Sequence, residues 1–199
     1  MKLKNILYLL AILLVSCTGT KKMTKKALAF EEQGMYNEAA NYFFDALKRK
    51  SSNTDAAMGL KRTGQLVLDD VLANFFKAHT SKEYKSSVYT YLKAVNWKAD
   101  AAVYKVNLEI PNYYVDYYNE DLGFYLTNIY DKALSFLDKE DFDKGLSFLD
   151  EILRLNPTYK DVAELKTYAR LEPIYRKGTL ALENKKFRKA YYLFAKTIA

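Results

Sequence analysis

The sequence contains very few of the residues that build disulfide scaffolds and metal centres. It has one cysteine, Cys17, and one histidine, His79. A single thiol cannot form an intramolecular disulfide, and one cysteine with one histidine is too few for a zinc module. The same scarcity leaves no Cys/His pair or Ser/His/Asp set to assemble. We therefore expect no disulfide, no metal site, no cofactor and no enzymatic activity.

Signals for β-structure are also missing. The chain has 3 prolines and 7 glycines, and no Asn-Gly or Asp-Gly pair marks a hairpin. Apolar residues instead recur at steps of three and four, as in Ala39, Tyr42, Phe43, Ala46 and Leu47. This is the stripe of an amphipathic helix. The pattern predicts an all-α chain without strands.

The overall composition is that of a protein that folds. Hydrophobic residues make up 50% and charged residues 28%, enough to bury a core. The net charge of +7 falls to +5 without Lys2 and Lys4, and such an excess attracts anionic surfaces only weakly. Basic and acidic residues are mixed after Lys26, so no nucleic-acid partner is expected.

An apolar run follows a positive start at the N-terminus. Lys2 and Lys4 precede ten apolar residues from Ile6 to Val15, and Ser16 ends the run. This is the layout of a secretory signal peptide. A helix needs about 20 apolar residues to cross a bilayer, so the run is too short for a permanent transmembrane span.

The end of this run is Leu14-Val15-Ser16-Cys17, which resembles the lipobox of bacterial lipoproteins. In that family a small residue precedes the cysteine that is lipidated and becomes the mature N-terminus. The resemblance implies a signal peptide over residues 1–16, a lipid on Cys17 and a lipidated basic tether over residues 17–26. The alternative is an ordinary cleaved signal that happens to contain a cysteine.

The residues after Cys17 bear on the membrane that holds the anchor. Thr18 stands where an aspartate would imply retention in the inner membrane, so the resemblance implies an outer-membrane lipoprotein that faces the periplasm. A surface orientation stays open. The tether carries four lysines, which either add about 1 kcal/mol each of attraction to an anionic lipid surface or are simply solvated.

Four stretches of the body share one pattern. An aromatic residue stands three positions before a small residue, a bulky apolar residue follows four positions later, and a small or aliphatic residue comes three after that. The four copies are Tyr36, Ala39, Phe43, Ala46; Tyr84, Ser87, Tyr91, Ala94; Phe142, Gly145, Leu149, Ile152; and Phe187, Ala190, Phe194, Thr197. One copy cannot bury its apolar face alone, so neighbouring copies must stack.

This pattern resembles the tetratricopeptide repeat (TPR), a unit of two antiparallel helices. Ala27, Phe30 and Gly34 extend the first copy upstream, and Pro157 follows the third copy where the family often has a closing proline. The resemblance implies a right-handed superhelical array of antiparallel helix pairs, a TPR-like α-solenoid, over residues 27–199. The small residues lie 48, 58 and 45 positions apart rather than about 34, so extra helix must be accommodated.

The same pattern assigns roles to particular segments and residues. Thr54 to Thr80 and Tyr159 to Asn184 are expected as long first helices, the second kinked or broken at Pro173. The residues expected to pack the repeats together are Ala39, Phe43, Ala46, Gly145, Leu149 and Ala190. The TPR resemblance places a partner-binding groove on the inner face at Asp69, Phe76, His79, Tyr130, Tyr175 and Thr179. For His79, near the end of its helix, the alternative that we favour is a capping role at the terminal carbonyls.

Four tyrosines fall within six residues between the second and third copies. They are Tyr113, Tyr114, Tyr117 and Tyr118, shortly after Pro111. Tyrosine is enriched in binding hot spots. Such residues more often divide between the core and the solvent edge of an irregular helix junction, and we favour this packing interpretation over a binding patch.

Two classes of function fit these features. The TPR resemblance implies a membrane-tethered adaptor or scaffold that holds a protein or peptide partner of the bacterial cell envelope in a concave groove. An aromatic-rich surface also fits glycan binding, as in the helical-repeat lipoproteins of outer-membrane nutrient uptake. Those are much longer chains with large insertions, so the adaptor is preferred.

The fourth copy continues to Ala199 without a stop signal. Its apolar residues Tyr192, Leu193, Phe194 and Ile198 are followed by no glycine cap or polar closing helix. Solenoids normally end in an element with a polar outer face. We therefore expect a chain truncated at its C-terminus, the alternative being that a partner or a second copy covers this stripe.

Overall fold

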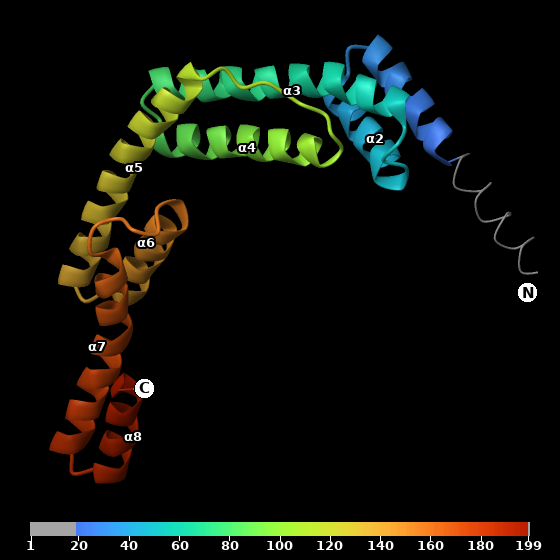
Figure 1. The fold of residues 1–199 in the computed structure, drawn as a ribbon. Coiled ribbons are helices and arrows are strands. Elements are labelled where there is room, and N and C mark those ends of the chain that lie inside the picture. The colour runs from blue at the N-terminus through green and yellow to red at the C-terminus, as the bar shows by residue number, and fades with distance from the viewer. Residues whose placement is uncertain (1–18, 199) are drawn as a thin grey trace, which may run out of the picture. The chain divides into compact units, whose positions relative to one another are not determined.

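The computed structural model describes residues 19–198, and all regular structure in that range is helical (Figure 1). The chain forms two compact units, Met1–Leu122 (unit 1) and Gly123–Ala199 (unit 2). Residues 19–32 form the first described helix. The helices that follow are α2 (Tyr36–Arg49), α3 (Thr54–Thr80), α4 (Tyr84–Val103), α5 (Tyr113–Asp138), α6 (Phe142–Leu155), α7 (Val162–Glu183) and α8 (Phe187–Ile198).

The long helix predicted from Thr54 to Thr80 is confirmed by α3, which has these bounds. Its start is fixed by Asn53, whose side chain accepts a hydrogen bond from the backbone N–H of Ala56 at 3.2 Å. Asp55 adds a negative charge to the first turn, next to the positive end of the helix dipole. A side-chain cap also begins α6, where Asp141 accepts from the Lys144 N–H at 3.4 Å, whereas α2, α4 and α7 begin without one.

Three local expectations differ from the structure. Residues 19–26 are helical, and Thr20 and Thr24 are buried, so the helical body begins before the predicted boundary at residue 27. The helix expected from Tyr159 begins at Val162 as α7 and continues through Pro173 without a break.

The tyrosine-rich segment is a regular helix rather than an irregular junction. Pro111 lies just before α5, where its missing N–H and fixed φ disturb no helical hydrogen bond. All four tyrosines from Tyr113 to Tyr118 consequently belong to the first turns of α5.

Four helix–helix connections have the same backbone geometry. Each has one residue of positive φ two positions before the next helix: Gly34 (74°), Lys82 (57°), Glu140 (59°) and Lys185 (56°). The residue after it donates its N–H to the carbonyl five positions back, as Met35 does to Phe30 and Asp141 to Phe136, both at 2.9 Å. This is the Schellman arrangement of a helix C-terminus. The next helix begins each time with the aromatic residue of the four-copy pattern, so the sequence repetition is also a structural one.

An extended segment connects α4 to α5 and lies against α3. Val106 and Leu108 are buried, whereas Asn107 and Glu109 between and after them are exposed. The Gln65 side chain accepts from the Glu109 N–H at 2.9 Å and donates to the Glu109 carbonyl at 3.1 Å. One side-chain amide thus gives this segment the pairing that a neighbouring strand would supply.

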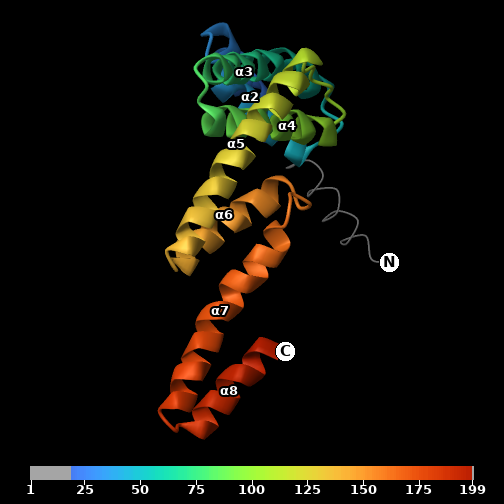
Figure 2. The same cartoon turned by 90° about the vertical axis from the view of Figure 1, so that its left-hand side faces the viewer.

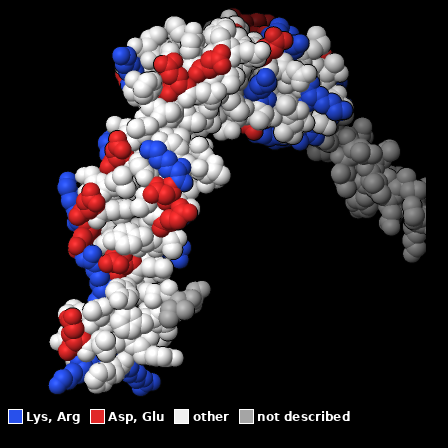
Figure 3. Space-filling model, turned by 60° about the vertical axis from the view of Figure 1, so that its left-hand side comes forward, with Lys and Arg blue, Asp and Glu red and all other residues white. Residues whose placement is uncertain are grey.

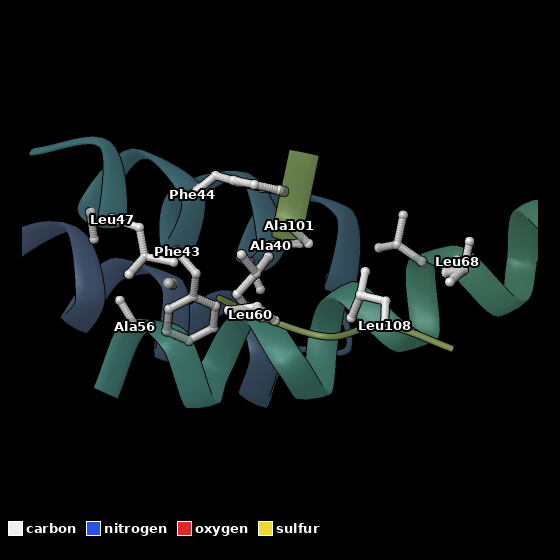
Figure 4. Packing of buried hydrophobic residues seen from close by; sticks show 14 of the residues in the cluster. Ala40, Phe43, Phe44, Leu47, Ala56, Leu60, Leu68, Ala101 and Leu108 are labelled. Atoms are coloured by element: carbon white, nitrogen blue, oxygen red, sulfur yellow. The ribbon is translucent and has the colours of Figure 1, made fainter. Parts of the chain in front are cut away.

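The helices of each unit pack in sequence order. In unit 1, α3 packs against both α2 and α4, and in unit 2, α7 packs against α6 and α8 (Figures 1 and 2). Phe43 of α2 points toward α3 near Leu60 and is fully buried (Figure 4). A Cβ on Gly59 would lie 2.2 Å from the Phe43 ring, so glycine is what allows this close approach.

The residues expected to pack the repeats are all buried. A Cβ on Gly145 would lie 2.6 Å from Cδ2 of Leu137, so glycine allows α6 to approach α5 closely. The buried set is Ala39, Phe43, Ala46, Gly145, Leu149 and Ala190.

Candidate functional site

Aromatic side chains gather in unit 1, where the end of α3 lies beside the start of α5 (Figures 1 and 2). The ring of His79 stacks on that of Tyr117, with centroids 4.6 Å apart and 22° between the planes. Phe76 and Tyr113 flank Tyr117 at 5.9 Å and 6.0 Å. We call Phe76, His79, Tyr113 and Tyr117 the aromatic face.

Two members of the aromatic face project into solvent. Phe76 is 44% exposed and Tyr113 is 52% exposed, whereas His79 and Tyr117 are half-buried between them. Both exposed rings contact the ring of Tyr117, and exposed aromatic residues of this kind are more typical of a binding surface than of a core.

A buried polar cluster lies behind the aromatic face. The Asp121 side chain is 1% exposed, and its two carboxylate oxygens are each 3.0 Å from Nδ1 of His79. The Ser87 hydroxyl donates a hydrogen bond to the same carboxylate. A buried carboxylate is tolerated only with such partners. The cluster therefore fixes the His79 ring and joins α3, α4 and α5.

The three residue types of a hydrolytic triad meet here, which the sequence did not predict. Their order differs from that of a triad, because Asp121 stands between Ser87 and His79. In a triad the imidazole contacts the serine hydroxyl and removes its proton. Ser87 is fully buried and donates to a carboxylate, so this geometry positions His79 and does not activate a nucleophile.

Further tyrosines connect the site to the core. Tyr91 and Tyr118 stack at 4.4 Å, and burial raises the pKa of both phenols. Burial, followed by the hydrogen bond with Tyr113, raises the pKa of Tyr114 to about 12. These phenols stay protonated at neutral pH and act as apolar packing with polar tips.

Carboxylates lie around the aromatic face. Asp116 and Glu120 follow Tyr113 at three and seven positions on α5, and both are exposed. Asp69 of α3 is also exposed, and its charge contributes to the raised pKa of Tyr114. The edge of this surface is consequently acidic, although the chain as a whole is basic.

Three of the six predicted groove residues lie at this site. Phe76 and His79 are in ring contact at 6.2 Å, and Asp69 lies two turns earlier on α3. The other three, Tyr130, Tyr175 and Thr179, belong to unit 2, on α5 and α7.

The three unit 2 residues have local contacts of their own. The Tyr130 hydroxyl donates to Asp161 at 2.6 Å, and this hydrogen bond is the main cause that raises the pKa of Tyr130 to about 12. Tyr175 is 54% exposed, with its ring 5.5 Å from that of Phe194. The Thr179 hydroxyl donates to the Tyr175 carbonyl at 3.2 Å.

Sequence reasoning missed Ser87 and Asp121 as site residues. They are 34 positions apart, and Asp121 is 42 positions from His79, so no local motif connects them. One signal in the sequence could have identified Asp121 as a buried residue. Asp121 follows Tyr114 by seven positions and Tyr118 by three, which places it on the buried stripe of α5 rather than among the solvated carboxylates.

Two further features of residues 19–198 concern metal binding and the membrane. No cluster of three or more histidine, cysteine or acidic side chains that could hold a metal ion occurs in this range. None of the helices within it is long and apolar enough to span a bilayer. Cys17, the predicted lipidation site, lies outside the described residues, as does the predicted signal peptide.

The chain was compared with protein-family models, with curated proteins and with solved structures, and none of the three comparisons gives a match. The TPR resemblance therefore depends on the residues and contacts described above.

Proposed function

We propose that this protein is a membrane-tethered TPR-like adaptor of the bacterial cell envelope, which binds a protein or peptide partner through the aromatic face of unit 1. The observation that carries the proposal is the aromatic face itself, with Phe76 and Tyr113 exposed over a fixed His79–Asp121 pair. A site whose side chains are already held in place loses little conformational entropy on binding.

The TPR-like part of the proposal has two supports. Four connections share one Schellman geometry, and each leads into a helix that begins the same residue pattern. Stacked helix pairs of this kind form right-handed superhelical arrays that present extended surfaces for partners. A long first helix such as α3 offers more surface than a standard repeat, which suits a scaffold.

The chemistry of the aromatic face indicates the kind of partner segment. Aromatic rings take up apolar side chains and also the flat guanidinium of arginine. Asp69, Asp116 and Glu120 around the rings attract positive charge. A segment that carries both apolar and basic side chains fits best.

Photo-crosslinking tests the adaptor proposal. A photoreactive phenylalanine analogue at Phe76 should give discrete adducts with an envelope protein. The matched control is Tyr36, another aromatic residue at 41% exposure in unit 1, where the analogue should give none. The Phe76 adducts should diminish with Tyr113→Ala, which removes a neighbouring ring without disturbing the core. Equal adducts from both positions, or none from Phe76, would refute the aromatic face as the binding surface.

The tether is tested separately. We propose that Cys17 carries the lipid and anchors the protein in the outer membrane, facing the periplasm. Cys17→Ala should abolish metabolic acyl labelling and release the protein from the membrane fraction, since stable anchoring depends on acyl chains. A variant that is labelled and sediments like the parent would refute the anchor while leaving the adaptor proposal intact.

A further inference from the structure

A second groove in unit 1 lies between α2 and the end of α4. Its volume is about 500 Å³, within the range of small-molecule sites. On each of the two helices the lining residues recur at steps of three and four, so each helix contributes one stripe of its surface to the groove. The lining consists of Asn41, Phe44, Asp45 and Lys48 from α2, and of Trp97, Asp100, Val103 and Tyr104 from the end of α4.

The floor of this groove is aromatic and fixed. Phe44 is 6% exposed and extends from α2 toward the end of α4 (Figure 4). Its ring lies 5.0 Å from that of Trp97 and 5.9 Å from that of Tyr104, at 74° in both cases. The Trp97 indole N–H donates to the Gly64 carbonyl at 2.9 Å, which holds the indole in place.

The rim of the groove offers hydrogen-bond acceptors and donors side by side. Asp45 and Asp100 supply carboxylate oxygens, Lys48 supplies an ammonium group, and the Asn41 amide supplies both kinds of group. Lys48 lies 3.3 Å from Asp45, but both are well exposed. An exposed pair of this kind is weak, so both groups can turn toward a ligand.

We propose that this groove binds the ring of a neutral sugar. A sugar ring presents C–H groups on its faces, which pack on aromatic carbon, and hydroxyls at its edge, which both donate and accept. An anionic ligand would meet Asp45 and Asp100, and a cationic one would meet Lys48. The mixed rim over an aromatic floor fits a neutral, hydroxyl-rich ligand better than either.

The proposal goes beyond the adaptor function and does not depend on it. The groove is formed by α2 and α4, whereas the aromatic face is formed by α3 and α5. A chain with both sites would hold a glycan and a protein segment at once.

Trp97 is the only tryptophan and lines the groove, so its fluorescence reports occupancy directly. The full chain is titrated with glucose, galactose, mannose and N-acetylglucosamine, and with short oligomers of each. At least one should change the fluorescence saturably. An open groove that contacts one ring predicts a Kd in the millimolar range for a monosaccharide.

Asp100→Ala should weaken that sugar about tenfold, because a hydroxyl then loses a charged acceptor. Asp100 is exposed, so this variant should keep the parent's thermal midpoint. The matched control is Asp70→Ala, an exposed carboxylate of α3 outside the groove, with no expected change in affinity.

Two results would overturn the proposal. One is the absence of a saturable response to every sugar by a correctly folded chain. The other is a saturable response to arginine amide, lost in Asp100→Ala, together with no saturable response to any sugar. That result would identify the groove as a pocket for a basic side chain. Adducts from the Phe76 position should be unchanged in Asp100→Ala, so failure here is distinguishable from failure of the adaptor proposal.

Discussion

Units 1 and 2 use the same turn and the same residue pattern, but the side chains beside that pattern are buried to different extents in the two units. The position after the small residue is the clearest case. It is Ala40 in the first copy and Val88 in the second, both fully buried, and Tyr191 in the fourth, which is 77% exposed. The local geometry of α8 is that of α2 and α4, but no described helix covers the corresponding face.

The difference separates two levels of organisation. A Schellman turn and a close glycine or alanine contact are enough to form a helix pair, because all their partners lie within one pair. Burial of the outer stripe requires the next pair along the chain. Unit 1 contains such a neighbouring pair. In the α7–α8 pair, lysine and arginine lie at the turn between the two helices, at the bottom of Figure 3, and the visible surface over the rest of the pair is largely uncharged.

The largest expected effect comes from core truncation in unit 1. Phe43→Ala removes a fully buried ring and should lower the free energy of unfolding by about 3–5 kcal/mol. Trp97 fluorescence during guanidinium unfolding reports unit 1 selectively. Tyr191→Ala should stay within about 0.5 kcal/mol of the parent. Comparable losses in both variants would mean that α8 is covered and would remove the contrast between the units.

Overpacking should have a smaller effect, and in both units. Ala39→Leu and Gly145→Leu place a bulky side chain in a close helix contact, at a cost of about 1–3 kcal/mol each. Far-UV circular dichroism during thermal unfolding measures the loss. Gly123 of α5 is the control, because a Cβ there meets nothing within 4 Å. Gly123→Ala should therefore stabilise α5 by roughly 0.5–1 kcal/mol. Unchanged midpoints for both leucine variants would contradict the repeat assignment.

Alkaline pH should weaken both units for different reasons. The pKa of Tyr114 and that of Tyr130 are raised from 10.0 to about 12. Below pH 10 the stabilising contribution is fully present. As pH rises toward 12 the unfolded chain releases these protons before the folded chain does, so stability falls.

The two tyrosines can be separated by one substitution. Asp161→Ala removes the carboxylate that accepts the Tyr130 hydrogen bond, which is the main cause of the shift, and should lower the pKa of that phenol, while Tyr114 in the core should not respond. Phenolate absorbance measures both. A parallel change at Tyr114 would contradict independent titration of the two units.

Substitutions at the turns should have a modest effect. Gly34 occupies the left-handed position of the first turn without steric cost, whereas Lys82 and Lys185 occupy it with a Cβ. Lys82→Gly and Lys185→Gly should each stabilise the chain by about 1 kcal/mol, and Gly34→Ala should destabilise it by a similar amount. Thermal midpoints of the three variants test this, and a loss of stability in both lysine variants would show that other contacts of the side chain dominate.

The sequence predicts elements whose determinants are local. The bounds of α3 follow from Asn53 and an uninterrupted apolar stripe, and the small residues Ala39 and Gly145 follow from spacing alone. The helical start of the tyrosine segment was not predicted, because clustered tyrosines after a proline are typical of an irregular junction, whereas here Pro111 directly precedes a regular helix.

The site was less predictable because its determinants are distant in sequence. The phenylalanine and the histidine on α3 were expected at a binding surface, but the buried Asp121 that holds the imidazole is 42 positions away. The groove between α2 and the end of α4 likewise joins two stripes, around Phe44 and Trp97, whose meeting depends on how both helices pack against α3. Periodicity assigns a residue to a face of its own helix, and only packing determines what lies opposite.

The pairing of Gln65 with Glu109 has a consequence for the order of folding. The Schellman turns close over five residues and can form as soon as a helix ends, whereas this contact closes a loop of 44 residues. Contacts of long sequence separation pay their loop-closure entropy before they yield stability, and they form late. The extended segment should therefore order only after α3 is complete. Its amide protons should be among the last in unit 1 to gain protection during refolding, with Gln65→Ala delaying them further.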